Sequence, residues 1–241
     1  MKKNKVYWTF SPLMQMPSVI FDNPDKITSL APCPVVNKFS LQTRIIKTPY
    51  ELSIKPEWIW NQVIEEYQFK GFVSSSKDVV DEFLWSNDTL ISTAQELWYN
   101  QHYPQFQIVS PYVFITEEDI DMYTLGLQNT ETRNKINNLR YIEAVLPISK
   151  MARPLSTAWA FTNKDEAKFI KNEPLYKLLF SEPVELLYFT PGPLFKDYAA
   201  SNNGFVNYQR RGTVRKFNNI FNRQPKKLFK EIKENVVYGE A

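Results

Sequence analysis

The sequence predicts a mainly β protein: an antiparallel β-sandwich or jelly-roll-like domain over residues 1–195, with a basic helical tail over residues 196–241 packed on or beside it. Hydrophobic residues make up 43% of the 241 residues and aromatic residues 15%, enough apolar surface to offset the chain entropy lost on folding. Glycine is rare, at 6 residues, whereas proline reaches 16, which suits short strands with proline-marked turns. Several apolar runs also alternate with polar residues at period two, as a sheet with one solvated face requires.

The N-terminal part supplies the first predicted strands. Residues 6–10 combine β-branched and aromatic side chains, which favour a pleated, half-buried surface. Residues 39–48 and 50–54 alternate apolar and polar positions, so each range predicts a strand.

The next two segments are harder to assign. The apolar residues of 58–67 have a helical spacing, but a strand that ends in a turn at Lys70 and Gly71 fits equally well. Residues 76–98 begin with Ser76 and Asp78, either of which can cap a helix, and predict a short helix followed by an irregular loop.

Closely spaced strands fill the middle of the chain. Residues 106–109 and 112–115 are two apolar runs split by a Ser-Pro pair, which predicts buried strands that meet at a bulge or bend. Residues 128–138 are polar and predict an exposed loop. Further strands are predicted at residues 141–148, 157–162, 168–171, 175–180 and 184–189, a spacing typical of a sandwich or barrel.

The C-terminal tail predicts two short amphipathic helices. Apolar residues recur at three- and four-residue spacing over 214–221 and again over 228–232, each time opposite basic residues. Pro225 is well placed for the first turn of the second helix, where its missing N–H costs nothing.

The tail also holds most of the excess positive charge. Residues 210–241 contain nine Lys or Arg against three Glu, whereas the rest of the chain is mildly acidic. Basic side chains interleaved with aromatic rings can bind a nucleic-acid backbone and stack on its bases. The alternative, which we favour, is that the apolar stripes dock on the body and the basic face is solvated. The residues that would contact a nucleic-acid or protein partner are Arg210, Arg211, Arg215, Lys216, Arg223, Lys226 and Lys227.

Cysteine and histidine are almost absent, which removes many kinds of catalytic and metal site. Cys33 and His102 are the single examples of their types, so the chain alone cannot form a disulfide, a four-thiolate zinc site or a two-histidine iron site. We therefore predict no catalytic residue and no cofactor. No apolar run approaches the ~20 residues needed to span a bilayer, and residues 6–20 lack a signal-peptide core, so we expect no membrane contact.

An Asp-x-Asp pair is the only candidate metal site. Asp119 and Asp121 follow the predicted strand 112–115, and carboxylates at a strand end can hold Mg²⁺ or Mn²⁺, as in some nucleotide-sugar transferases. The alternative is that Thr116 caps a helical turn, whose positive end favours the acids that follow. We favour the capped turn, because so short a motif often arises by chance.

Arg153 is a candidate anion clamp. It precedes Pro154 at the entrance of the predicted strand 157–162, and a guanidinium there can bind a phosphate or carboxylate with two hydrogen bonds. It can equally fix the preceding polar loop through backbone carbonyls, which is the role we favour.

Several segments between residues 30 and 190 resemble an uncharacterised family of proteins from large tailed bacteriophages, including those of marine bacteria. The matching pieces are Cys33-Pro34, Thr48-Pro49-Tyr50, Ser110-Pro111-Tyr112, Thr116-Glu117-Glu118, the run from Ile148 to Leu155, Glu173-Pro174-Leu175-Tyr176 and Leu186-Leu187-Tyr188-Phe189. The resemblance implies a viral origin and a β-rich body, and it supplies no mechanism.

These observations predict a non-enzymatic binding protein that acts in the host cytoplasm. Its partner would be a host or phage protein, or a nucleic acid bound through the basic tail. Two alternatives stay open: a metal-dependent, transferase-like enzyme that uses Asp119 and Asp121, and a minor virion or assembly component. The aromatic surplus makes a homo-oligomer compatible with the sequence.

Overall fold

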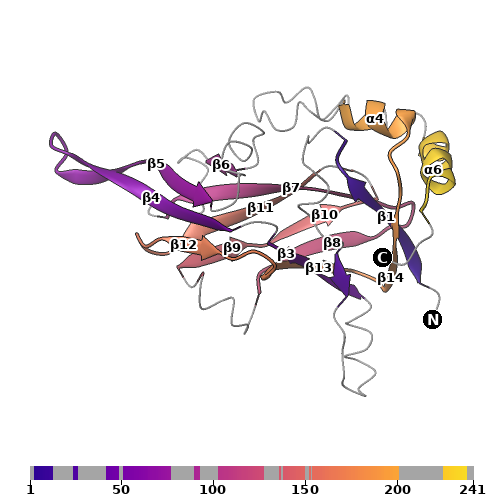
Figure 1. Cartoon of the computed structure of the whole chain (residues 1–241), viewed down its shortest axis with the longest axis horizontal. Helices are drawn as coiled ribbons and strands as arrows, with labels where there is room; N and C mark the ends of the chain where they lie inside the picture. The colour runs from indigo at the N-terminus through magenta and orange to yellow at the C-terminus, as the bar shows by residue number, and fades with distance from the viewer. Residues whose placement is uncertain are drawn as a thin grey trace, which may run out of the picture.

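In the residues that it describes, the computed structural model has a mainly β architecture with three sheets and two short helices, and these sheets do not close into a barrel (Figure 1). It describes residues 3–12, 24–26, 42–48, 51–76, 90–92, 103–127, 136, 138–149, 152, 154–200 and 225–237. Within these ranges the prediction of a mainly β chain with a C-terminal helix is confirmed.

The largest sheet has six strands in the order β14-β1-β7-β11-β9, with β6 on the same edge of β7 as β1. Its strands are β1 (Asn4–Phe10), β6 (Leu90–Ser92), β7 (Gln105–Ile115), β9 (Leu139–Ile142), β11 (Pro154–Phe161) and β14 (Val184–Tyr188). The expected irregularity at Ser110 and Pro111 is confirmed, because the register between β7 and β11 shifts there. Proline has no N–H for the sheet, which fits a bulge.

A second sheet has five antiparallel strands in the order β10-β8-β13-β3-β2. They are β2 (Asp25–Lys26), β3 (Thr43–Lys47), β8 (Asp121–Leu125), β10 (Ala144–Pro147) and β13 (Pro174–Phe180). Side chains of this sheet and of the six-stranded sheet meet in one hydrophobic core. Phe114 on β7 contacts Phe180 on β13 with ring centroids 6.1 Å apart, and Ser110 forms a 3.3 Å hydrogen bond with Tyr176.

The third sheet includes a hairpin that projects from the body. It contains β4 (Leu52–Asn61), β5 (Glu66–Ser76) and β12 (Ala167–Phe169) in the order β12-β4-β5. Strand β12 pairs only with the first residues of β4, so the far half of the β4–β5 hairpin extends beyond the body (Figure 1). The structure settles the ambiguous segment 58–67 as a hairpin rather than a helix.

Two sequence expectations about the sheets are wrong. The predicted turn at Lys70 and Gly71 lies inside β5, where a register shift opposite Glu57 marks a bulge. The expectation of a wholly antiparallel arrangement fails at β1 and β14, which pair in parallel with Asn4 opposite Val184. A parallel pair needs a long connection, so the local pattern of either strand does not reveal it.

Two helices cover the other end of the molecule. Helix α6 (Pro225–Glu234) begins at Pro225 as predicted and buries Leu228, Phe229 and Ile232. These residues pack in a second hydrophobic cluster with Tyr7 of β1 and with helix α4 (Pro193–Ala200). Helix α4 is not among the predicted elements, and the predicted domain boundary after residue 195 falls inside it.

Candidate functional site

The far half of the β4–β5 hairpin, residues 58–69, is called the arm below, and its end, residues 59–67, the tip. One face of the arm carries a ladder of aromatic side chains. Trp58 contacts Phe69 at 5.7 Å between ring centroids, and Trp60 contacts Tyr67 at 5.1 Å. Phe69 in turn contacts Phe72 at 4.9 Å, and Phe72 packs against the main core. The ladder therefore anchors the arm to the body.

A lysine from the body covers this aromatic face. Lys164 lies in the turn between β11 and β12, and its ammonium is 4.5 Å from the ring centre of Tyr67 and 5.6 Å from that of Trp58. At these distances a cation is attracted to the ring faces. The contact helps to set the direction in which the arm projects.

Hydrogen bonds fix the shape of the turn at the end of the arm. The Asn61 carboxamide oxygen accepts from the Val63 N–H at 2.9 Å, and the amide nitrogen donates to Gln68 across the hairpin at 2.9 Å. Glu65 has a φ of 49°, a left-handed conformation that few non-glycine residues adopt. The turn therefore has a defined conformation.

The tip exposes an unusual amount of apolar surface. Its exposed apolar side chains are Ile59, Trp60, Val63, Ile64 and Tyr67, with 49%, 50%, 91%, 48% and 57% of their surface exposed. Glu65 and Glu66 lie between them and are also exposed. Exposed apolar residues gathered on one projecting element are typical of an interaction surface.

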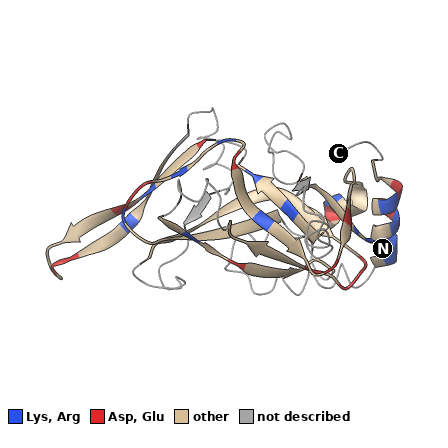
Figure 2. Cartoon of the chain, turned by 90° about the horizontal axis from the view of Figure 1, so that it is seen from below, with Lys and Arg blue, Asp and Glu red and all other residues tan. Residues whose placement is uncertain are grey.

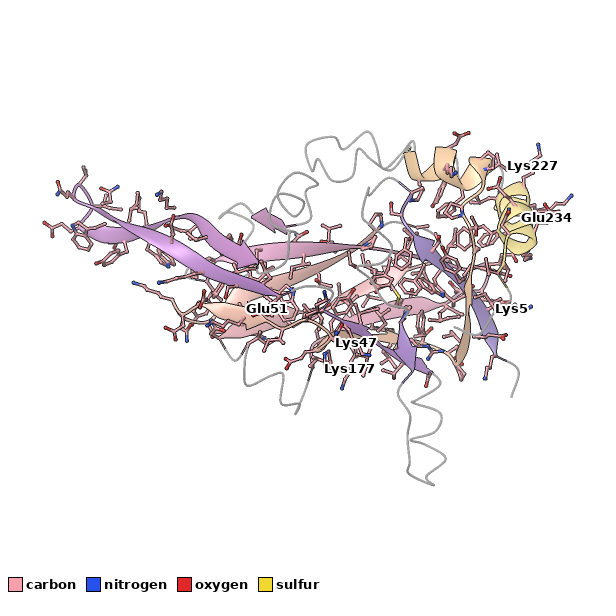
Figure 3. The ribbon with its side chains drawn as sticks, in the orientation of Figure 1. Lys5, Lys47, Glu51, Lys177, Lys227 and Glu234 are labelled. Atoms are coloured by element: carbon pink, nitrogen blue, oxygen red, sulfur yellow. The ribbon has the colours of Figure 1, made fainter. Side chains whose placement is uncertain are left out.

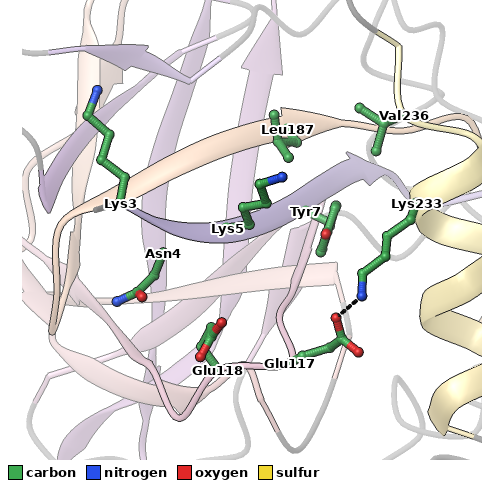
Figure 4. A pocket seen from close by; sticks show the side chains of 9 residues that line it. All are labelled: Lys3, Asn4, Lys5, Tyr7, Glu117, Glu118, Leu187, Lys233 and Val236. Atoms are coloured by element: carbon green, nitrogen blue, oxygen red, sulfur yellow. Dashed lines mark ion pairs between the residues drawn. The ribbon is translucent and has the colours of Figure 1, made fainter. Parts of the chain in front are cut away.

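A hollow of about 540 Å³ lies near helix α6. It is called the N-terminal hollow below, because Lys3, Asn4 and Lys5 at the start of the chain are among its lining residues. Its wall combines charged residues with the phenol of Tyr7 and the apolar side chains of Leu187 and Val236 (Figure 4). The charged and polar lining residues are Lys3, Asn4, Lys5, Glu117, Glu118 and Lys233.

One ion pair closes a side of this hollow. Lys233 of α6 contacts Glu117 in the turn after β7, and the hydrogen bond to Glu117 raises the pKa of Lys233. Lys3, which directly precedes β1, and Lys5 on β1 are exposed and have no ion pair with any residue whose position is described. The hollow therefore offers the ammonium groups of Lys3 and Lys5 and the Glu118 carboxylate beside the apolar side chains of Leu187 and Val236.

The proposed metal ligands Asp119 and Asp121 lie close to this hollow but do not line it. Asp119 is exposed, and Asp121 begins β8. The Thr116 hydroxyl accepts from the Glu118 N–H at 3.1 Å, so Thr116 caps a turn here, although the turn is not helical. Among the described residues, no cluster of three or more His, Cys, Asp or Glu could hold a metal ion. The metal site stays a prediction.

The other predicted site residues fall into two groups. Lys226 and Lys227 are exposed on α6, with the apolar face of that helix turned into the protein, and Figure 3 shows Lys227 pointing outward. This is the docked arrangement that the sequence favours for the second tail helix. The remaining predicted site residues lie outside the described residues: Arg153, Arg210, Arg211, Arg215, Lys216 and Arg223. Cys33, His102 and the first predicted tail helix also lie outside them.

Neither the tip nor the N-terminal hollow is among the sites predicted from the sequence. The tip was open to a helical interpretation, although the absence of glycine from its turn and the run of apolar residues there were visible signals. The N-terminal hollow has no local signal, because its walls come from separate parts of the chain, at residues 3–5, 7, 117–118, 187, 233 and 236.

Comparisons with known proteins give no identity: no family model, curated protein or solved structure matches the chain. The resemblance to a phage family therefore stays a prediction. In the described part of the chain, neither helix has the length and apolar character to cross a bilayer.

Proposed function

We propose that this protein is a non-enzymatic binding protein whose β-sandwich body presents the arm to a protein partner. The exposed apolar tip carries the proposal. Removing apolar surface from water is favourable by about 25 cal/mol per Å². The five apolar side chains of the tip are exposed in the isolated chain, so a partner that covers them gains this free energy on binding.

The charges at the tip favour a protein over a nucleic acid. Glu65 and Glu66 are exposed beside Val63 and Ile64, and carboxylates repel the phosphates that supply most nucleic-acid affinity. A rigid turn with apolar side chains also loses little conformational entropy on binding. A partner with a basic, apolar surface fits these features.

The test compares proteins retained by the immobilised chain from an extract of the cells in which it is expressed. The tip variant is Val63→Ser with Ile64→Ser, and the matched control is Val145→Ser, since Val145 is 54% exposed on β10 of the body. We expect the wild type and the control to retain the same proteins and the tip variant to lose them. Equal retention by all three would contradict the proposal.

A further inference from the structure

We propose that the partner of the tip is a second copy of this chain, whose N-terminal hollow receives it. This inference rests on the proposed function and names the partner for the same surface. It follows from the charges, the apolar surfaces and the placement of the two features.

The charges of the two surfaces are opposite. The tip presents Glu65 and Glu66, while the nearby Lys70 is paired with Glu57 at 3.6 Å. The rim of the hollow presents Lys3 and Lys5 together with the exposed Glu118 carboxylate. Its third lysine, Lys233, is already paired with Glu117, so the three lysines and two glutamates that line the hollow give it a net charge of +1. Docking the tip would therefore bring two free carboxylates to two free ammonium groups, an arrangement that steers association and fixes orientation.

The apolar parts also match. Val63 at the apex of the turn is 91% exposed and Ile64 is 48% exposed. The hollow has a volume of about 540 Å³ and includes Leu187 and Val236 in its wall. Apolar anchors that enter a pocket surrounded by polar contacts are the usual centre of a protein interface.

The placement of the two features excludes an intramolecular contact. The arm lies at one end of the longest axis, and α6, whose Lys233 lines the hollow, lies at the other (Figure 1). Acidic residues colour the end of the arm, and α6 at the opposite end carries several basic residues together with acidic ones (Figure 2). Each copy therefore offers a different surface to each neighbour, which makes the contact heterologous and builds rings or open chains.

Sedimentation velocity of the purified full chain over a range of concentrations tests this inference. We expect the wild type to form larger species as concentration rises, and to lose them at high salt because exposed charges are screened. Two charge-reversal variants serve as probes: Glu65→Lys with Glu66→Lys on the tip, and Lys3→Glu with Lys5→Glu on the hollow.

Each variant alone is expected to associate at least tenfold more weakly than the wild type, because its tip and hollow then carry like charges. Mixed in equal amounts, the two variants are expected to associate again, since the reversed tip meets the reversed hollow and the native tip meets the native hollow. Misfolding of either variant would not give this recovery. The control Glu234→Lys changes an exposed α6 residue outside the hollow and should associate like the wild type.

A wild type that stays monomeric at every concentration, or a mixture that stays monomeric, would overturn the inference. If the tip variant Val63→Ser with Ile64→Ser still loses retained proteins in that case, the proposed function stands with a different protein as partner. If retention is also unchanged, both fail.

Discussion

At the scale of single residues, Val63 and Ile64 lie in a tight hairpin turn. Such turns usually contain Gly, Asn, Asp or Ser, whose backbones or side chains suit the turn conformation. Only Asn61 follows this preference, through its hydrogen bond to the Val63 N–H. Val63 and Ile64 make no contribution to the two hydrophobic clusters. Packing in these two clusters therefore does not account for their apolar character, which agrees with the proposed contact outside the chain.

Because two tyrosines are buried, we expect the free energy of unfolding to fall at alkaline pH. Tyr176 and Tyr198 are at most 1% exposed, and desolvation raises the pKa of each phenol above its ordinary value of 10.0. Above pH 10.0 the unfolded chain releases these protons while the folded chain keeps them, so the free energy of unfolding falls by about 1.4 kcal/mol per pH unit for each phenol. Denaturant unfolding at a series of pH values measures this slope.

Tyr176→Phe and Tyr198→Phe should each remove their share of the slope. Each substitution also loses a hydrogen bond, which Tyr176 shares with the Ser110 hydroxyl and Tyr198 accepts from the Ala152 N–H. The pH dependence, rather than the stability at neutral pH, is the readout. Phenolate absorbance that rises fully near pH 10 in the folded protein would show that these two phenols are not protected.

At the scale of elements, helix α4 depends on a side chain from α6. Both carboxylate oxygens of Glu231 accept from α4, one from the Leu194 N–H at 3.0 Å and one from the Phe195 N–H at 2.9 Å. These N–H groups have no partner within the helix, and a negative charge at this end also favours the helix dipole. Gly192 permits the approach, because a Cβ there would lie 2.4 Å from the Glu231 carboxyl carbon.

We expect Glu231→Ala to lower the free energy of unfolding by about 1–2 kcal/mol, the usual cost of losing a helix cap. Urea denaturation measures it. The control is Glu234→Ala on the same helix, whose exposed contact with Lys230 at 3.8 Å is worth less than about 0.5 kcal/mol. Equal losses in the two variants would show that Glu231 does not act as a cap.

Helices α6 and α4 differ in how far the sequence predicts them. Helix α6 is predictable because Pro225 and its apolar stripe are local signals, and most strands are predictable from alternation or from β-branched and aromatic runs. Helix α4 is not, since the group that caps it lies more than 30 residues further along the chain. The tip is missed for a different reason: its apolar spacing suits a helix, and only pairing between β4 and β5 decides for a strand.

At the scale of the whole molecule, two surfaces with different chemistry occupy opposite ends (Figures 1 and 2). The two large sheets bury their apolar faces against each other. Contacts of Phe72 with Phe106 and with Phe69 connect this core to the aromatic ladder of the arm. The body thus acts as a rigid support that holds an apolar, acidic tip away from itself. The central claim is that this tip is a protein-binding surface.

Site-specific photo-crosslinking tests that claim most directly. A photoreactive residue replaces Val63 in the full chain, and in a second version it replaces the exposed Val145 of β10. Irradiation in the expressing cells is predicted to give a discrete protein adduct from position 63, with a second copy or another protein, and none of that adduct from position 145. No adduct at position 63, or the same adducts from both positions, would contradict the claim.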